Sequence, residues 1–477
     1  MKKIFSANTV VILILSLNTL CAQSVKLIYT TPTERWVEAK KAAKIEKSAD
    51  GANITVYTDE KLQVIDGIGG AFNELGWTAL TSIPSEQAKE VFNALFSESG
   101  CNFSMCRIPL GASDYALSYY SSNDVPEDFE MRDFNIDRDK FILIPYIKGA
   151  LRERPDLLVW ASPWSPPAWM KVNDHYAMRS GEFENAVDGN KMVPDAQILN
   201  NATAFKMQER YLKAYALYFS KFVQAYAEAG VPLFAIQPQN EIAYQPNWPS
   251  CTWRSEDMAY FIGSFLGPQF EKDGLDTEIW LGTINCGRPA YIRTILDDEK
   301  ASKYIKGVGY QWGGSNAIPA IAKEYPSYKF MQTENKCGEH ENDWTSLQRS
   351  WETLVHFMNN STGSHMYWNM VLDETGKSAW GWPQNSMVVI DRANQEIIYT
   401  DEFYLFKHLS HFVQPGDHYL KSSEGKNHLA FQLKDGRIMV LINNPEEVAK
   451  SVTVQVGDKP FLVELKAKSI NSIVVQN

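Results

Sequence analysis

Between about residue 66 and residue 400, helix-like stretches alternate with short apolar runs that end in polar or aromatic residues. The stretch 138–155 reads as a helix, and so does 204–230, which ends at Gly230 and leads into the apolar run 232–237. Repeated β–α units with apolar strands predict a parallel sheet covered by helices. This pattern restricts the chain to a small set of α/β folds.

Eight such apolar runs predict a closed (β/α)8 TIM barrel, in which the active site forms just past the C-terminal ends of the strands. A doubly wound open sheet is the alternative fold. It usually carries a glycine-rich phosphate loop after its first strand, and "DGIGGAF" (66–72) lacks the spacing of such a loop. The predicted strands lie near residues 66–72, 102–109, 157–163, 232–237, 278–284, 306–312, 328–334 and 364–370.

After about residue 400 the pattern changes to short alternating runs separated by turn residues, which is typical of an antiparallel β domain. Residues 54–65 also alternate and predict two short strands. They have no partners nearby, so we expect them to complete the C-terminal sheets. The predicted organisation is a segment 23–65 that joins a β-sandwich, a catalytic barrel over 66–402 and a C-terminal β-sandwich over 403–477.

The N-terminus has the pattern of a secretory signal peptide over residues 1–22. Lys2 and Lys3 precede an apolar run at 10–17, which is too short to span a bilayer. We therefore expect export to the periplasm or the medium, and no integral membrane segment once the signal is removed. Cys21 leaves lipoprotein anchoring as a less favoured alternative.

Composition narrows the choice of partner. The formal net charge of -11 argues against nucleic acid, which usually requires a basic face. The chain has 14 tryptophans, which suggests flat apolar surfaces in the core or around a ligand. Beyond residue 22 five cysteines remain with no Cys-x-x-Cys spacing, so we expect buried thiols rather than a disulfide framework.

Two glutamates end apolar runs in the same way, Glu241 in "FAIQPQNE" and Glu334 in "KFMQTE". A single glutamate at a strand end is usually a structural ion-pair partner, but two with matched placement among aromatic residues favour chemistry. Cleavage of a glycosidic bond needs one protonated and one ionised carboxyl group facing a cleft. Repulsion between them raises the pKa of one and allows that division at mild pH.

Other chemistries have weaker support in the sequence. The eight histidines form no His-Glu-x-x-His motif, and a solvated helix face is the expected setting of His408 and His411. "GEHEN" (338–342) is a possible metal site only because it is near Glu334. There is no Gly-x-Ser-x-Gly motif. We expect no metal and no organic cofactor, and Asp114 is the one further acidic candidate.

Six segments of the chain resemble glycoside hydrolase family 30, the family of glucosylceramidases and microbial β-1,6-glucanases. The resemblance covers nearly the whole chain after the signal segment. The segments are "DGIGGAFNE" (66–74), "CRIPLGASDYALSYYS" (106–121), "ASPWSPPAWMK" (161–171), "QPQNE" (237–241), "QTE" (332–334) and "YWNMVLDETGKSAWGWPQNS" (367–386).

The resemblance implies a (β/α)8 barrel with an attached β-sandwich, and a retaining mechanism through a covalent glycosyl-enzyme. Glu241 matches the acid/base of the family and Glu334 matches its nucleophile. Asn240 is then placed to bind the sugar 2-hydroxyl, and Arg107 to orient Glu334 and keep it ionised. The residues implied to bind substrate are Arg107, Asp114, Trp164, Asn240, Trp312, Trp368 and Trp382.

The chain departs from the glucosylceramidase branch around Trp312, where Gln311 replaces a histidine and Gly313 replaces a tyrosine. The segment 380–386 is closer to the β-1,6-glucanase branch. We therefore expect a β-1,6-linked glucan as substrate and a monomeric enzyme, with glucosylceramide as the alternative substrate. A non-catalytic carbohydrate-binding protein would keep the aromatic residues without needing both glutamates, and a metal-dependent barrel hydrolase would need clustered histidine and aspartate.

Overall fold

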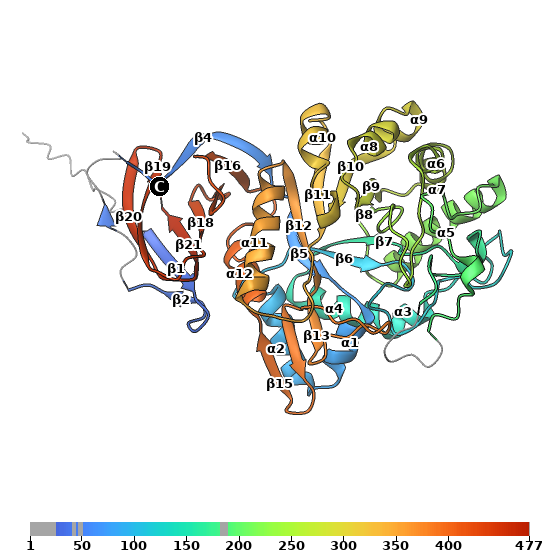
Figure 1. The fold of residues 1–477 in the computed structure, drawn as a ribbon, viewed down its shortest axis with the longest axis horizontal. Coiled ribbons are helices and arrows are strands. Elements are labelled where there is room, and N and C mark those ends of the chain that lie inside the picture. Colours follow the sequence, from blue (N-terminus) through green and yellow to red (C-terminus); the bar gives the residue numbers. More distant parts are fainter. Residues whose placement is uncertain (1–24, 41–43, 46–50, 182–188, 477) are drawn as a thin grey trace, which may run out of the picture.

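The computed structural model describes residues 25–40, 44–45, 51–181 and 189–476. The predicted signal peptide lies outside these residues. The described chain forms a closed barrel, a ten-stranded sheet beside it and a small three-stranded sheet (Figure 1). The small sheet consists of β13 (Val371–Asp373), β14 (Val388–Asp391) and β15 (Glu396–Tyr399).

All eight predicted strands form the barrel, and every neighbouring pair is parallel. The closed barrel is therefore confirmed and the open doubly wound sheet is excluded. The strands are β5 (Gly67–Ala71), β6 (Met105–Pro109), β7 (Leu158–Ser162), β8 (Ala235–Ile236), β9 (Glu278–Ile284), β10 (Ile305–Gln311), β11 (Lys329–Glu334) and β12 (Thr362–Asn369).

Large side chains fill the inside of the barrel. Trp160 and Trp280 pack there with Met105, Met331 and Met366, all at most 2% exposed. The interior is thus a packed core and not a channel, as the apolar strand sequences require. Chemistry is confined to the ends of the barrel.

Helices cover the outside of the barrel, and two of them differ from expectation in their bounds. The stretch 204–230 forms a helix over its central 20 residues and ends at Gly230, whose φ of 80° suits glycine. This long helix is α5 (Glu209–Glu228). The remaining helices, besides two between residues 137 and 153, are α1 (Glu74–Thr81), α2 (Ser85–Phe96), α6 (Ser255–Phe261), α7 (Gly267–Asp273), α8 (Pro289–Leu296), α9 (Glu299–Ser302), α10 (Ile318–Glu324), α11 (Trp344–Met358) and α12 (Asp401–Ser410).

The single helix expected over 138–155 is two helices, α3 (Asp137–Phe141) and α4 (Leu143–Glu153). Pro145 explains the break. Its ring clashes with the carbonyl four residues earlier and it has no N–H for a helical hydrogen bond, so a helix cannot continue through it from Phe141. Proline is tolerated in the first turn of the new helix.

The ten-stranded sheet combines the C-terminal strands with the N-terminal ones and encloses a core of its own, which confirms the predicted β-sandwich. Residues 54–64 form one strand and not two: its start pairs in parallel with β19 (Lys450–Val456), and its remainder pairs with β16 (His418–Ser422). The strands are β1 (Val25–Thr30), β2 (Val37–Glu38), β3 (Lys44–Ile45), β4 (Ile54–Val64), β16 (His418–Ser422), β17 (His428–Gln432), β18 (Ile438–Asn444), β19 (Lys450–Val456), β20 (Lys459–Leu465) and β21 (Ser469–Val475).

Helix α12 lies between barrel and sandwich (Figure 1) and contains the expected boundary at 402/403. The prediction that His408 and His411 lie on a solvated helix face is wrong. His408 is fully buried, with Nδ1 2.8 Å from Ser472 Oγ and Nε2 2.9 Å from Thr30 Oγ1, and His411 is half-buried. Most residues of α12 are buried between the two parts, and His408 joins the helix to the sandwich.

Candidate active site

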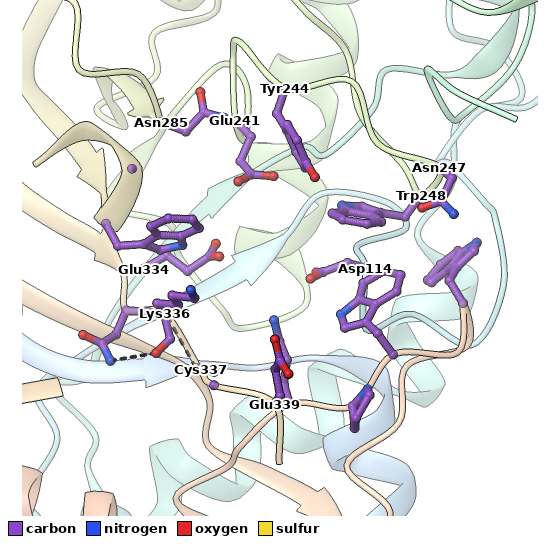
Figure 2. A pocket seen from close by; sticks show the side chains of 18 of the residues that line it. Asp114, Glu241, Tyr244, Asn247, Trp248, Asn285, Glu334, Lys336, Cys337 and Glu339 are labelled. Atoms are coloured by element: carbon purple, nitrogen blue, oxygen red, sulfur yellow. Dashed lines mark hydrogen bonds between the residues drawn. The ribbon is translucent and has the colours of Figure 1, made fainter. Parts of the chain in front are cut away.

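A cavity of about 960 Å³ opens at the C-terminal ends of the barrel strands. Segments that follow β8, β10, β11 and β12 supply most of its lining. Glu241 and Glu334 both line the cavity, and Figure 2 shows their carboxylates pointing into it. The structure thus brings together two residues that are far apart in the sequence, at the end of the barrel where active sites form.

Glu241 stands in an unusual backbone conformation. Strand β8 is only two residues long, so the chain leaves the sheet early and reaches Glu241 through an irregular segment. The residue has a φ of 51°, in the left-handed region that few non-glycine residues adopt. Its backbone N–H donates to Thr283 Oγ1 at 3.2 Å. Such strain persists only where the surroundings hold it, and it is common in functional sites.

Glu334, at the end of β11, is held by two donors. Arg107 Nη1 lies 2.7 Å from Glu334 Oε2, and Gln311 Nε2 donates to the same oxygen at 2.9 Å. Hydrogen bonds between ionised groups are short and strong, so this contact fixes the carboxylate and favours its charged form.

Arg107 is fully buried and makes contacts on every side of its guanidinium. Nε and Nη2 donate to Ser162 Oγ at 3.2 and 2.8 Å, and Nη2 donates to Asn240 Oδ1 at 2.6 Å. Three indole rings surround it, with the ring centroids of Trp164, Trp160 and Trp368 at 4.4, 5.0 and 5.5 Å from the guanidinium carbon. The cation is therefore fixed in place before any substrate arrives.

Asn240 has its amide orientation set by three donors. Its Oδ1 accepts from Arg107, from Gln311 Nε2 at 2.7 Å and from the Thr283 hydroxyl at 3.2 Å. With the oxygen occupied, Nδ2 is the group left to donate to a ligand hydroxyl.

The two carboxyl groups differ in their electrostatic surroundings. Burial raises the pKa of Glu334, while Arg107 and Gln311 oppose that rise. The pKa of Glu241 is raised well above its usual value, first by burial and then by the charges of Glu334 and Asp114. Glu241 is therefore the group that keeps a proton, and Glu334 is the one that ionises first.

Aromatic side chains form two walls of the cavity. Trp312 is 41% exposed, with Lys336 Nζ 5.4 Å from its ring centroid. On the other side Trp248 and Trp382 lie with their ring centroids 4.2 Å apart, next to Trp380. Indole faces of this kind pack against the C–H faces of sugar rings.

All nine predicted site residues lie at this end of the barrel. They divide into a group that lines the cavity and a group buried around Arg107. The first group is Asp114, Glu241, Trp312, Glu334 and Trp382, and the second is Arg107 itself with Trp164, Asn240 and Trp368.

Gln311 is the residue that the sequence did not reveal as part of the site. It was notable only as a departure from a family pattern, yet its amide joins Glu334 to Asn240. Its position as the last residue of β10 was the available signal, because residues at strand ends meet at the barrel mouth. Thr283 and Trp248 were missed in the same way.

No cluster of three or more metal-ligating side chains occurs in the described parts of the chain. The acidic residues of "GEHEN" are engaged otherwise: Glu339 lines the cavity, and Glu341 pairs with Arg349 at 2.9 Å. The described cysteines are free thiols, four of them buried.

A family model described as the glycosyl hydrolase family 30 TIM-barrel domain matches residues 65–413. The chain belongs to glycosyl hydrolase family 30. "Putative glucosylceramidase 3" of Caenorhabditis elegans is 28% identical over 79% of this chain and 72% of that protein. "Endo-1,6-beta-D-glucanase neg1" of Aspergillus fumigatus is 25% identical over 83% of this chain and 82% of that protein.

Among solved structures of the family, "The endo-beta1,6-glucanase BT3312" superposes with a TM-score of 0.79 at 25% identity, over 94% of this chain and 99% of that one. Membership in family 30 makes the protein a glycoside hydrolase with a retaining mechanism. Retention requires two carboxyl groups on one cavity, which this barrel supplies.

Proposed function

We propose that the protein hydrolyses β-glucosides by double displacement, with Glu334 as the nucleophile and Glu241 as the acid/base. The observation that carries this assignment is the asymmetric position of Arg107. It donates directly to Glu334, whereas Glu241 faces two other carboxyl groups. The arrangement leaves one anion and one proton donor on the same cavity.

In the first step the Glu334 carboxylate attacks the anomeric carbon, and the bond to the leaving oxygen breaks as Glu241 donates its proton to that oxygen. The product is a glycosyl ester of Glu334. Asn240 Nδ2 donates to the sugar 2-hydroxyl, a contact that strengthens in the transition state.

In the second step water attacks the anomeric carbon, Glu241 takes a proton from that water, and Glu334 leaves as a carboxylate. The ester carries no charge, so the repulsion that raised the pKa of Glu241 falls in the intermediate. Glu241 is then a carboxylate when a base is needed and an acid when a proton is needed. The same contacts serve both steps.

A β-1,6-linked glucan is the substrate that we favour. A relative and a structural neighbour named as endo-1,6-β-glucanases support this choice, as does the aromatic lining of the cavity. Its volume of about 960 Å³ is near the upper end of the usual range for small-molecule sites, about 300–1,000 Å³, which suits more than one sugar ring. Glucosylceramide is the second candidate, supported by the relatives named as putative glucosylceramidases.

We also propose export through the signal segment 1–22 and action as a monomer. Support for export is the pair Lys2 and Lys3 followed by an apolar run. No described helix is long and apolar enough to cross a membrane. Protease protection of the protein in whole cells, compared with its release into medium and periplasm, tests the location.

Substitution of each glutamate tests the roles. We expect Glu334→Gln to abolish turnover of gentiobiose, β-1,6-glucan and glucosylceramide alike. Glu241→Ala is expected to slow gentiobiose hydrolysis at least 100-fold more than hydrolysis of an aryl glucoside with a good leaving group, because only the poor leaving group needs a proton; general acid catalysis contributes about 10²–10⁴-fold. Product analysis on the three substrates identifies the preferred one.

Glu339→Gln is the matched control for these variants, since Glu339 lines the same cavity and makes no contact with Arg107 or Gln311. It should retain most of the activity. Equal losses in Glu241→Ala on activated and unactivated substrates would contradict the acid/base assignment.

A further inference from the structure

The buried carboxylate of Glu402 on α12 lies outside the cavity, behind the residues that line it. The residue is 1% exposed. Its Oε2 accepts from the Tyr367 hydroxyl at 2.7 Å and from Asn385 Nδ2 at 3.0 Å, and its Oε1 accepts from the Ser350 hydroxyl. All three partners are neutral side chains from different segments. A buried carboxylate persists only where donors satisfy it, and here three converge on it.

One of the three contacts leads to the proposed nucleophile. Ser350 Oγ, which donates to Glu402, accepts from Asn335 Nδ2 at 2.8 Å. Asn335 directly follows Glu334 and lines the cavity. The chain Glu402–Ser350–Asn335 therefore fixes the backbone immediately after the attacking carboxylate.

The other two contacts of Glu402, with Tyr367 and Asn385, connect it to segments that carry aromatic residues of the site. Tyr367 directly precedes Trp368, one of the rings around Arg107. Asn385 belongs to the segment after β13 that carries Trp382, and its backbone N–H donates to Cys337 O at 3.0 Å. Glu402 thus reaches three separate parts of the site through neutral hydrogen bonds, without touching the cavity.

The three side chains that donate to Glu402 are not accessible to water. Ser350, Tyr367 and Asn385 are fully buried and Asn335 is 2% exposed. If the carboxylate were lost, solvent could not replace it, so the donors would have to move to find acceptors. The segments that carry Glu334 and the aromatic wall would move with them.

We propose that Glu402 is a positioning residue for the hydrolytic reaction, which aligns the Glu334 segment and the Trp368 and Trp382 segments through Ser350, Tyr367 and Asn385. The inference rests on the proposed role of Glu334 as nucleophile. A shift of about 1 Å in a reacting group can cost on the order of 100-fold in rate, so small movements suffice. A glutamine at this position keeps the shape but turns one acceptor into a donor that faces Ser350.

The rate at which Glu334 is glycosylated tests the proposal. An activated 2-deoxy-2-fluoro-β-glucoside should add one glycosyl group to the wild-type enzyme, which is measured by intact mass. We expect Glu402→Gln to lower the maximal labelling rate about tenfold or more, with a much smaller change in the concentration for half-maximal rate, because alignment and not binding is lost. Ser350→Ala removes both the hydrogen bond to Glu402 and the acceptor of Asn335 but leaves the Tyr367 and Asn385 contacts, and it should lower the same rate.

Leu409→Ala is the matched control, because Leu409 lies on the same helix, is fully buried and is apolar. It should destabilise the protein yet label at the wild-type rate below its melting temperature. A wild-type rate in Glu402→Gln, or an equal loss in Leu409→Ala, would overturn the positioning role.

If Glu402→Gln does not fold, Ser350→Ala and Tyr367→Phe decide the matter: slowed labelling in either supports the proposal, and wild-type rates in both overturn it. Failure of the wild-type enzyme to be labelled at Glu334 would instead count against the proposed function.

Discussion

At the residue scale, the buried cation of Arg107 contacts one of the two glutamates and not the other, so the two carboxyl groups differ in charge state. Arg107 donates to Glu334 and to Asn240 and makes no hydrogen bond to Glu241. Burial raises the pKa of Glu334 and Arg107 opposes that rise through a direct hydrogen bond, whereas burial and the charges of Glu334 and Asp114 raise the pKa of Glu241 well above its usual value. Lysine could not replace it, because a point charge has no fork to reach Ser162, Asn240 and Glu334 together.

A buried histidine makes stability depend on pH. His365 on β12 is fully buried, and neither ring nitrogen has a hydrogen-bond partner among the described residues. Burial lowers its pKa from 6.5 to about 3. Below pH 6.5 this histidine is protonated in the unfolded chain but stays neutral in the folded chain. The free energy of unfolding therefore decreases as the pH falls from 6.5 toward 3.

We predict that His365→Leu makes the fall of stability with acid shallower by about 1.4 kcal/mol per pH unit between pH 6 and pH 4, because leucine does not titrate. At pH 7.5 the variant should differ little, since an apolar side chain of similar size occupies the same site. Urea unfolding at a series of pH values measures the slope. An unchanged slope would show that this histidine is not neutral in the folded state.

At the element scale, packing overrides helix propensity where α2 meets α4. Gly149 lies in α4, and a Cβ added there would meet Phe92 Cζ at 2.3 Å. Alanine is the better helix former by about 1 kcal/mol, but overpacking a core costs about 1–3 kcal/mol.

We predict that Gly149→Ala lowers the free energy of unfolding by up to about 2 kcal/mol net, because the Phe92 ring, 5% exposed, has little room to move and the overpacking cost outweighs the gain in helix propensity. Adding Phe92→Leu removes the clashing ring atoms, so the double variant should lose less than the sum of the two single losses. Chemical denaturation of the four proteins measures the coupling. Strict additivity would mean that the helices separate freely.

The elements differ in how much of them the sequence could predict. The barrel strands are short apolar runs bounded by turns, and their local pattern was sufficient to place all eight. The break at Pro145 was readable from one residue, whereas the single strand β4 was not, because two different partners keep it extended along its length. The roles of Gln311 and Glu402 could not be predicted from the sequence, because their hydrogen-bond partners depend on which strand ends and helices meet in the folded protein.

At the scale of the whole molecule, barrel and sandwich share structure and are not simply tethered. Strand β4 runs from the sandwich directly into β5, and the joining residue Ile65 exchanges backbone hydrogen bonds with Gly416 and Asp417, both at 2.8 Å. One hydrophobic core includes Leu429 and Phe431 of the sandwich together with barrel residues. Unfolding of the sandwich would therefore expose part of the barrel core.

This continuity predicts that heating unfolds the protein in one calorimetric transition, with calorimetric and van't Hoff enthalpies that agree. His408 supplies a way to separate the parts, because its ring on α12 hydrogen-bonds Thr30 of β1 and Ser472 of β21 in the sandwich. We expect His408→Ala, which leaves both hydroxyls without this partner and opens a cavity, to lower the melting temperature and to broaden or split the transition. Ser423→Ala, a change within a sandwich loop, should leave a single transition. Two transitions in the unaltered protein would show that the shared core does not couple the two folds.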